Sequence, residues 1–234
     1  MQVPEDTFSR GLAAYWAMDE NSGQYVYDGS GNSNDGRRGN HDDEDGDNSD
    51  PKWTTGKIGS ALVFDGLDDY VDCGNDASLD ISGAITLEAW IHLNESPSSD
   101  DHDFIIIHKK EPSQGYAMRI RDDQDALRAD FKGLTDDYIS GTTISLQTNK
   151  WYHVAVVWDG SFMRSYVNGV LDLIDDSSGT TATGADIKLS ISHEDRSFAG
   201  IIDEVRIYNR ALSPEEIRYH YNCSHPPLEI KCCS

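Results

Sequence analysis

The fold of this chain is indicated most clearly by one stretch near its end, Ala199-Gly-Ile-Ile-Asp-Glu-Val-Arg-Ile-Tyr-Asn-Arg-Ala-Leu-Ser-Pro-Glu-Glu-Ile217. Its first half is mostly apolar and predicts a strand over 201–208 that carries one buried acid, Asp203. Its second half predicts a short helix ending near Tyr221, because Ser213 is a good N-cap, with proline next and glutamate three residues after the cap. We therefore expect a closing strand followed by one short C-terminal helix.

The rest of the chain predicts further strands separated by turn signals. Both alternating faces of 85–93 and of 151–158 are largely apolar, so each is expected to be a central strand covered on both sides. Together the segments favour an all-β, antiparallel two-sheet sandwich. We expect one domain over 1–222 and a Cys-containing tail at 223–234. The other strand-like segments are 12–18, 61–64, 70–73, 104–108, 116–121, 127–131, 163–167 and 187–192.

The chain is strongly acidic, with 42 Asp and Glu against 19 Lys and Arg and a net charge of −23. Nucleic acid is excluded as an expected partner, because phosphate binding needs clustered Lys and Arg. Two interpretations of the acidity remain, a run of calcium sites or a surface adapted to high salt, where charge repulsion is screened. The scatter of Asp over nearly every loop favours the salt-adapted surface.

No stretch is long and apolar enough to cross a bilayer, so membrane insertion is not expected. The first residues lack the basic start and apolar core of a signal peptide, which leaves two expectations. Either a signal peptide was removed, or the protein never used one.

An acidic loop insertion is expected at 37–52, and its centre, 40–50, has no apolar residue. Asp43, Asp45 and Asp47 have the spacing of a calcium loop. Asn48, however, stands where the loop glycine belongs, and Thr54 where the bidentate Glu belongs. We favour a solvated loop, with a second calcium site as the alternative. The acidic turn at 65–69 is likewise expected to be a plain turn.

The four cysteines, Cys73, Cys223, Cys232 and Cys233, permit three complete pairings, and the sequence does not choose among them. A bridge from Cys223 to either of the last two would close a tail loop, and Cys73 would then staple the tail to the body. Disulfides imply an oxidising, extracellular destination. The alternative is a zinc site that combines the tail thiolates with His220 or His225.

Seven segments in unbroken order resemble laminin G-like, concanavalin A-like lectin/glucanase domains. They are 11–20, 28–36, 56–71, 85–91, 151–160, 166–169 and 202–213. The resemblance implies a jelly-roll sandwich whose first and last strands lie side by side. It also implies a structural calcium ion, with carboxylates from Asp28 and Asp203 and further oxygens from Asn32 and Asp35. The alternative is that Asp28 caps its own turn and that Asp203 pairs with a nearby arginine, Arg206 or Arg210.

Catalysis is not expected. Related glucanases use a Glu-x-Asp-x-x-Glu run, which this sequence lacks. Glu88 stands alone on its strand, and alternation would place Asp203 and Glu204 on opposite faces. A polysaccharide hydrolase is therefore the least favoured function.

The favoured function is a non-catalytic, calcium-stabilised extracellular module for glycan binding or adhesion, with a surface glycan or glycoprotein as partner. Sugar recognition needs aromatic platforms beside polar side chains. The candidate binding residues are His108, Tyr116, Arg119, Tyr138 and Trp53. Each would instead be a core or charge-balancing residue in the simpler interpretation. The alternative function is a structural or host-contact decoration protein of a virion or cell-surface assembly, including a homo-oligomer bridged by its tail.

Overall fold

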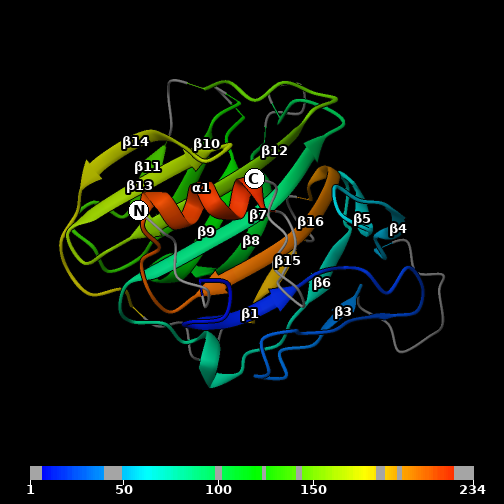
Figure 1. Cartoon of the computed structure of the whole chain (residues 1–234), viewed down its shortest axis with the longest axis horizontal. Coiled ribbons are helices and arrows are strands. Elements are labelled where there is room, and N and C mark those ends of the chain that lie inside the picture. Colours follow the sequence, from blue (N-terminus) through cyan, green and yellow to red (C-terminus); the bar gives the residue numbers. More distant parts are fainter. Residues whose placement is uncertain are drawn as a thin grey trace.

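The computed structural model describes residues 7–39, 49–97, 102–122, 125–140, 144–182, 188–193 and 197–223. Within these ranges the chain is built almost entirely of β-strands (Figure 1). The helical elements are η1 (Ala77–Leu79) and α1 (Pro214–Asn222). The strands are β1 (Leu12–Trp16), β2 (Tyr25–Val26), β3 (Gly36–Arg38), β4 (Lys52–Thr55), β5 (Ser60–Asp65), β6 (Tyr70–Asp72), β7 (Ile85–Leu93), β8 (Phe104–Glu111), β9 (Gln114–Ile120), β10 (Leu127–Phe131), β11 (Tyr138–Ser140), β12 (Trp151–Trp158), β13 (Phe162–Val167), β14 (Val170–Asp176), β15 (Ser190–Ser192) and β16 (Ala199–Tyr208).

The strands form two antiparallel sheets, as expected for a jelly-roll sandwich. Sheet A has the order β14-β13-β12-β7-β16-β5-β4, and β1 also pairs with β16. Sheet B has the order β11-β10-β9-β8-β15-β6-β3-β2. The pairing of β1 with β16 confirms that the first and last strands lie side by side. It also explains why segments far apart in the sequence belong to one closing motif, since Leu12 pairs with Tyr208 and Trp16 pairs with Val205.

The core lies between the sheets, because each strand directs alternate apolar residues inward. In sheet B, one line of paired residues shows this clearly: Val71, Ile191, Ile107, Met118, Ala129 and Ile139 oppose one another in turn on adjacent strands. All six are buried in the main apolar cluster. Neighbouring positions along each strand therefore face outward.

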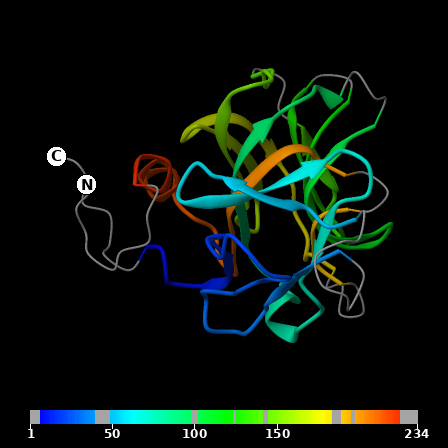
Figure 2. The same ribbon diagram turned by 90° about the vertical axis from the view of Figure 1, so that its right-hand side faces the viewer.

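Helix α1 covers the outer face of sheet A (Figure 2, red ribbon). Ile217 of the helix packs into a second apolar cluster with Ala155, Val157 and Tyr208. This covering buries β7 and β12 on both faces, and the strand order confirms that they are central strands. Strand β12 is apolar beneath the helix, whereas β7 turns the polar Thr86 and Glu88 to that side. The sandwich therefore has a helix layer on one side and the outer face of sheet B on the other.

The start of α1 confirms the predicted capping box. The Ser213 hydroxyl accepts a hydrogen bond from the Glu216 amide at 3.2 Å, and the Ser213 amide donates to Glu216 Oε2 at 2.8 Å. Glu216 also pairs with Arg210 at 2.9 Å. The helix ends at Asn222, one residue beyond the expected end.

A buried ion network lies beneath α1. Glu88 is fully buried, and His220 Nδ1 lies 2.9 Å from its Oε1. His153 Nε2 is 3.7 Å from Glu88 Oε2, and Arg206 Nη1 is 3.8 Å from Oε1. These neighbours hold the pKa of Glu88 well below its usual range, although burial alone would raise it. Glu88, the one acid of its strand, is therefore surrounded by histidine and arginine side chains from other elements. The engagement of His220 with Glu88 also weakens the zinc alternative.

Strand β16 contains a bulge that the sequence alternation did not predict. The pairing with β7 shifts register between Asp203 and Arg206, and Glu204 has a φ of 55°. A bulge inserts an extra residue into one strand, so the regular alternation of side chains is interrupted at this point. The prediction that Asp203 and Glu204 point to opposite faces relied on that alternation. Arg206 pairs with Glu204, and Tyr15 donates a hydrogen bond to the same carboxylate at 2.9 Å.

The expected disulfide from Cys73 to the tail is wrong. Cys73 is a free thiol, and it is buried in the main apolar cluster with its Sγ 3.9 Å from the Val71 carbonyl oxygen. Burial raises the pKa of this thiol, which makes it a poor nucleophile. Cys223, which caps α1, is disulfide-bonded, as the predicted bridge from this residue requires. Cys232 and Cys233 lie outside the described ranges.

The expected acidic insertion and the expected lack of a membrane span can be compared only with the described residues. The centre of the acidic insertion, 40–48, is not described, whereas its expected flanks belong to β3 and β4. Among the described residues, no helix has the length and apolar character that a membrane span requires.

Candidate functional site

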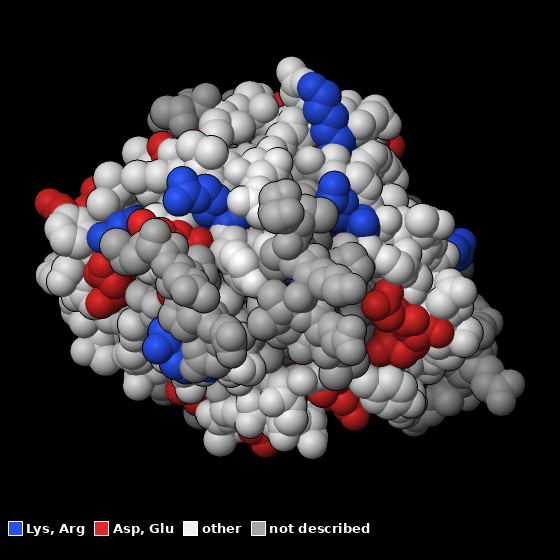
Figure 3. All heavy atoms as spheres, in the orientation of Figure 1, with Lys and Arg blue, Asp and Glu red and all other residues white. Residues whose placement is uncertain are grey.

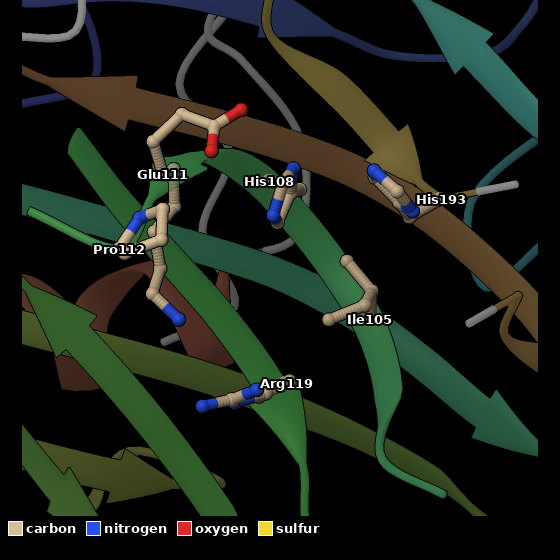
Figure 4. Close-up of a pocket in the computed structure, with 7 residues that line it drawn as sticks. Ile105, His108, Glu111, Pro112, Arg119 and His193 are labelled. Carbon is tan, nitrogen blue, oxygen red and sulfur yellow. The ribbon is translucent and has the colours of Figure 1, made fainter. Parts of the chain in front are cut away.

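A pocket of about 330 Å³ opens on the outer face of sheet B, beside the hairpin of β8 and β9 (Figure 4). It is lined by Ile105, His108, Lys110, Glu111, Pro112, Arg119 and His193. A bulge in β8 shapes it, because the pairing with β9 shifts register between Ile105 and Ile107. Residues 105 and 108 would face opposite ways in a regular strand, but the bulge lets both line the pocket.

His108 is the central polar side chain of the pocket. Its ring centroid lies 4.4 Å from that of His193, and Figure 4 shows the two rings side by side. Burial, together with the nearby His193, Lys110 and Arg119, lowers the pKa of His108 to about 3. The ring is therefore neutral near pH 7, and it offers one donor and one acceptor nitrogen.

Arg119 is held in place by two carboxylates. Its Nη1 lies 3.0 Å from Asp103 Oδ2, and its Nη2 lies 2.8 Å from Asp130 Oδ2. Two pairs to one planar guanidinium fix its orientation as well as its position. The pocket therefore presents a rigid arginine rather than a mobile one.

Asp130 organises the positive charge around the pocket. Its side chain is only 1% exposed, and Arg128 Nη2 and Lys110 Nζ approach it at 3.2 Å and 3.7 Å in addition to Arg119. Burial lowers the pKa of Lys110, and nearby arginines lower it further, although Asp130 raises it. Three cations thus gather around one buried carboxylate on a protein whose net charge is −23.

Three of the five predicted binding residues come together on this face. His108 and Arg119 line the pocket, and Tyr138 stands on β11 with its side chain 50% exposed and the Arg128 guanidinium carbon 4.0 Å from its ring centroid. Tyr138 is held on the same face because it opposes Asp130 across the β10–β11 pair. A tyrosine beside an arginine suits contact with a sugar ring.

The other two predicted binding residues lie elsewhere. Tyr116 points into the core, where its hydroxyl donates to the Leu79 carbonyl oxygen at 3.0 Å. Trp53 lies on β4 of sheet A and donates from its indole nitrogen to the Gly23 carbonyl oxygen at 3.1 Å. Neither belongs to the pocket face.

Sequence reasoning missed several residues that shape the pocket. Lys110, His193, Asp103 and Asp130 were not selected. Arg128 and Asp130 alternate with apolar residues on β10, so this polar outer pattern was a usable signal. No local pattern pointed to His193, because this residue lies just after β15, a strand of only three residues.

The turn that resembles a calcium loop is internally hydrogen-bonded. Asp28 Oδ1 accepts from the Tyr15 and Ser30 amides at 2.9 Å and 2.8 Å, and Oδ2 accepts from the Asn34 amide at 3.0 Å. Asp35 Oδ1 accepts from the Asp28 amide at 2.9 Å. The amide of the Asn32 side chain donates to the Ala13 carbonyl oxygen at 2.9 Å. These bonds stabilise the turn and occupy oxygens that a cation would need.

Asp203 has a different environment. It is fully buried; its Oδ2 accepts from the Ile58 amide at 3.0 Å, and its Oδ1 has no hydrogen-bond partner. Burial, with a smaller contribution from the charges of Glu204 and Asp19, raises the pKa of Asp203 to about 8, although its backbone hydrogen bonds act in the opposite direction. The nearby arginines pair with Glu204 and Glu216 instead. Asp203 is thus a buried carboxylate that lacks a cation.

The turn over 56–60 connects Asp203 with a second acid, Asp19. Asp19 Oδ1 accepts from the Ser60 amide at 2.9 Å. A Cβ at Gly59, whose φ is +55°, would lie 2.0 Å from Asp19 Oδ1, and one at Gly56 would lie 2.6 Å from Asp203 Oδ2. Only glycine fits such close approaches. Asp203 and Asp19 thus both accept hydrogen bonds from amides of this turn.

The acidic turn at 65–69 brings three carboxylates within 4.8 Å of one another. Asp69 Oδ2 accepts from the Asp65 amide at 2.8 Å, and Asp65 Oδ1 accepts from the Leu67 amide at 2.9 Å. Burial raises the pKa of Asp69 to about 7. These local bonds stabilise the turn, and the three clustered carboxylates also offer oxygens of the kind that a hard cation prefers.

Comparisons with known proteins agree on the fold. The family model for the concanavalin A-like lectin/glucanases superfamily matches residues 64–218, while no curated protein matches the chain. Domain 4 of AbnA, a GH43 extracellular arabinanase from Geobacillus stearothermophilus, solved with arabinotriose, is similar at a TM-score of 0.67 and 24% identity, with 89% of this chain and 97% of that chain covered.

Two toxin structures are also similar. The ligand-binding domain of botulinum neurotoxin serotype D, solved with N-acetylneuraminic acid, has a TM-score of 0.68 and 15% identity, covering 93% of this chain and 52% of that one. The binding domain of Paraclostridial mosquitocidal protein 1 has a TM-score of 0.67 and 14% identity, covering 92% and 53%. This chain spans about half the length of these toxin domains, and the likeness shows a shared fold.

Proposed function

Because this chain belongs to the concanavalin A-like lectin/glucanase superfamily, we propose that it is a non-catalytic, extracellular glycan-binding module whose ligand lies on the outer face of sheet B. The observation that carries the proposal is the pocket in which neutral His108 stands beside the doubly anchored Arg119. Two of the similar structures were solved with sugars, arabinotriose and N-acetylneuraminic acid, which supports a glycan as the ligand class.

The chemistry of the pocket suits sugar hydroxyls. A neutral imidazole both donates and accepts, and a guanidinium donates several parallel hydrogen bonds. Because Arg119 is already oriented by Asp103 and Asp130, binding would cost little side-chain entropy. Pre-organised polar groups beside the apolar Ile105 are the usual composition of a small-ligand site.

The arrangement of carboxylates favours binding over hydrolysis. Retaining hydrolysis needs two carboxyl groups about 5 Å apart, one of them free to deliver a proton. Asp103 and Asp130 are both engaged by Arg119, which leaves Glu111 as the remaining acid of the pocket lining. Incubation with a polysaccharide array should therefore yield retention without release of reducing sugars.

The binding proposal is tested by calorimetric titration of the best glycan from that array against wild type and His108→Ala. The variant should lose about fivefold to tenfold in affinity, the value of a hydrogen bond in a buried site. His92→Ala is the matched control, because His92 lies on β7 of sheet A. Equal affinity of His108→Ala and wild type would place the ligand elsewhere, and release of sugars would make the protein an enzyme.

Calcium is the second part of the proposal. We assign its carboxylate ligands to Asp203 and Asp19, because the unpartnered oxygen of Asp203 is buried and both acids flank the 56–60 turn. Because the pKa of Asp203 is raised to about 8, the ion would displace the proton of this side chain near pH 7 and tie the closing strand to that turn. We do not assign Asp28 to the ion, because both of its carboxylate oxygens accept hydrogen bonds that stabilise its own turn.

The melting temperature with calcium chloride and with EDTA tests this assignment. At a calcium concentration 100 times Kd, wild type should gain about 2.7 kcal/mol of stability. Asp203→Asn should abolish the gain, whereas Asp28→Asn should lower stability equally in both buffers. A calcium response that survives in Asp203→Asn but disappears in Asp28→Asn would restore the original assignment.

We also propose that the acidic surface is adapted to high salt. Figure 3 shows acidic side chains in several separate groups on one face, with Lys and Arg between them, rather than in one binding patch. Screening at about 1 M salt shortens the range of repulsion to about 3 Å, so the melting temperature should rise from about 0.1 M to about 1 M KCl with calcium fixed. An unchanged melting temperature would contradict this part of the proposal.

A further inference from the structure

We propose that the protein holds an alkali-metal cation, sodium or potassium, between Asp50 and Gln24, at the point where the two ends of the acidic segment 40–48 meet. The proposal does not depend on the glycan-binding function, because no residue that lines the pocket takes part in it. It comes from two buried side-chain oxygens, one on Asp50 and one on Gln24, that have no hydrogen-bond partner among the described residues.

The position is defined by the strands that flank the acidic segment, β3, β4 and β6, which lie on the same side of the molecule in Figure 1. Gly39 follows β3, and its amide donates to the Tyr70 carbonyl oxygen at 2.9 Å. The Tyr70 amide donates in turn to the Ser49 carbonyl oxygen at 3.4 Å, so β6 holds both ends of the segment. The sequence between these ends, 40–48, carries five carboxylates. Their charge raises the concentration of cations around the point where the segment begins and ends.

Asp50 is a buried carboxylate with one unsatisfied oxygen. Its side chain is 5% exposed, and its Oδ2 accepts a hydrogen bond from Gln24 Nε2 at 2.8 Å. Arg38 Nη2 lies 3.7 Å from the same oxygen, which is longer than a hydrogen bond. Oδ1 has no hydrogen-bond partner within the part of the chain that the structure describes. Because a buried charge without a partner is costly, Oδ1 needs a donor or a cation.

Gln24 supplies the second oxygen, and the contacts of its amide determine where that oxygen points. Nε2 donates to the Arg38 carbonyl oxygen at 2.8 Å and to Asp50 Oδ2 at 2.8 Å. Turning the amide over would place its oxygen against two other oxygens, so this orientation is fixed. Oε1 is then buried without a hydrogen-bond partner in the described ranges. Two acceptors cannot satisfy each other, whereas one cation serves both.

Further oxygens lie beside Asp50 Oδ1. Gly39 has a φ of +60°, and a Cβ on it would lie 2.0 Å from Asp50 Oδ1 and 3.1 Å from both the carbonyl and the hydroxyl oxygen of Ser49. Only glycine allows this approach. The carbonyl oxygen of Ser49 has a second lone pair besides the one that faces Tyr70. Carboxylate, amide, carbonyl and hydroxyl oxygens are the ligands that hard cations take in proteins.

The charge of these ligands favours a monovalent ion. Asp50 is the one carboxylate among the ligands described, and Arg38 already lies beside it. A calcium ion would therefore leave two positive charges in excess, whereas an alkali ion leaves one. Calcium affinity depends on the number of charged ligands. The calcium ion that we assign to Asp203 and Asp19 has two carboxylates, so the two positions should select different ions.

Melting temperatures at equal ionic strength test the proposal. The full chain, freed of calcium with EDTA, is melted in sodium, potassium and tetramethylammonium chloride at about 1 M, where charge screening is the same in all three. Sodium or potassium should raise the melting temperature by about 3–6 °C over tetramethylammonium, the shift expected from an ion present at about ten times its Kd. Asp50→Asn keeps the shape of the side chain and should abolish the difference.

Asp72→Asn on β6, where the carboxylate pairs with Lys188, is the matched control and should keep the full difference. Gln24→Glu gives the position a second carboxylate. In an Asp203→Asn background, which lacks the other proposed calcium ligand, Gln24→Glu should therefore create a rise in melting temperature with calcium chloride. The absence of such a rise would contradict the placement of Gln24 at the ion.

Equal melting temperatures of wild type in the three chlorides would show that water or a donor group of the chain serves these oxygens, and would overturn the proposal. A difference that survives in Asp50→Asn would overturn it as well. A response of wild type to calcium alone that is lost in Asp50→Asn would replace the alkali ion by calcium. None of these results bears on the salt-adapted surface, because the three chlorides screen charges equally.

Discussion

Replacing Asp130 by alanine should cost this protein about 3 kcal/mol of stability and most of its glycan affinity. The side chain is 1% exposed and balances Arg119, which is itself almost buried, at 2.8 Å. Removing one partner of a buried ion pair costs about 3–5 kcal/mol, because the other charge remains without compensation.

The lower end of that range applies for two structural reasons. Asp103 still holds Arg119 from the other side at 3.0 Å, so the guanidinium keeps one carboxylate. The side chains of Arg128 and Lys110 are 18% and 19% exposed, so both can turn toward water when Asp130 is lost. The loss in binding follows because Arg119 would no longer be fixed in the pocket.

Urea unfolding measures the stability change, and calorimetry with the best-binding glycan measures the affinity. The double variant Asp130→Ala with Arg119→Met should be less destabilised than the sum of the single variants, with a coupling of about 2 kcal/mol. Asp136→Ala removes an exposed carboxylate from the neighbouring loop and should change stability by less than about 0.5 kcal/mol. Full additivity, or an Asp130→Ala variant as stable as the control, would refute the reasoning.

Three further outcomes are expected. Glu88→Gln should lose about 3 kcal/mol at pH 7 because it uncouples the carboxylate from His220. Since the pKa of Glu88 is lowered on folding, its contribution is present above its unfolded pKa of about 4.3 and is lost as pH falls below that value. Thermal melts from pH 7 to pH 2 should therefore show a flatter acid decline for the variant, and parallel curves would contradict this. Ser213→Ala should cost about 1 kcal/mol in urea unfolding through loss of the N-cap, whereas no loss would show that packing alone holds α1. Gly59→Ala should lower the melting temperature, because its Cβ would lie 2.0 Å from Asp19 Oδ1 at a positive φ, and an unchanged value would mean that the turn can move away.

The long strands and the closing helix were predictable because their signals are local. Segment 151–158 is largely apolar on both faces, which indicates burial on both sides, and segment 85–93 has an apolar residue at every second position, which indicates a strand. The capping box of α1 is contained in four residues. The short strands β2 and β3, by contrast, have two and three residues, too few to show a period.

The candidate site was predictable only in part. His108, Arg119 and Tyr138 have the right chemistry, but their common face depends on a bulge in β8 and on pairing across four strands. Likewise, the acid partner of Asp203 depends on how the 56–60 turn packs against two distant segments. Such long-range register leaves no pattern in a single sequence.

The contact between the first described residues and α1 also bears on how the protein presents its face to a partner. Thr7 donates a hydrogen bond to Glu216 at 2.9 Å, and the Phe8 ring stacks on His220 at 4.3 Å. Both described ends of the chain, near residues 7 and 223, are therefore anchored on the helix side of the sandwich. A tether, a sensor chip or a neighbouring domain joined near either end would leave sheet B turned toward the solution. Arrays of such tethered copies would gain avidity for any surface that offers several binding sites, without any change to the individual site.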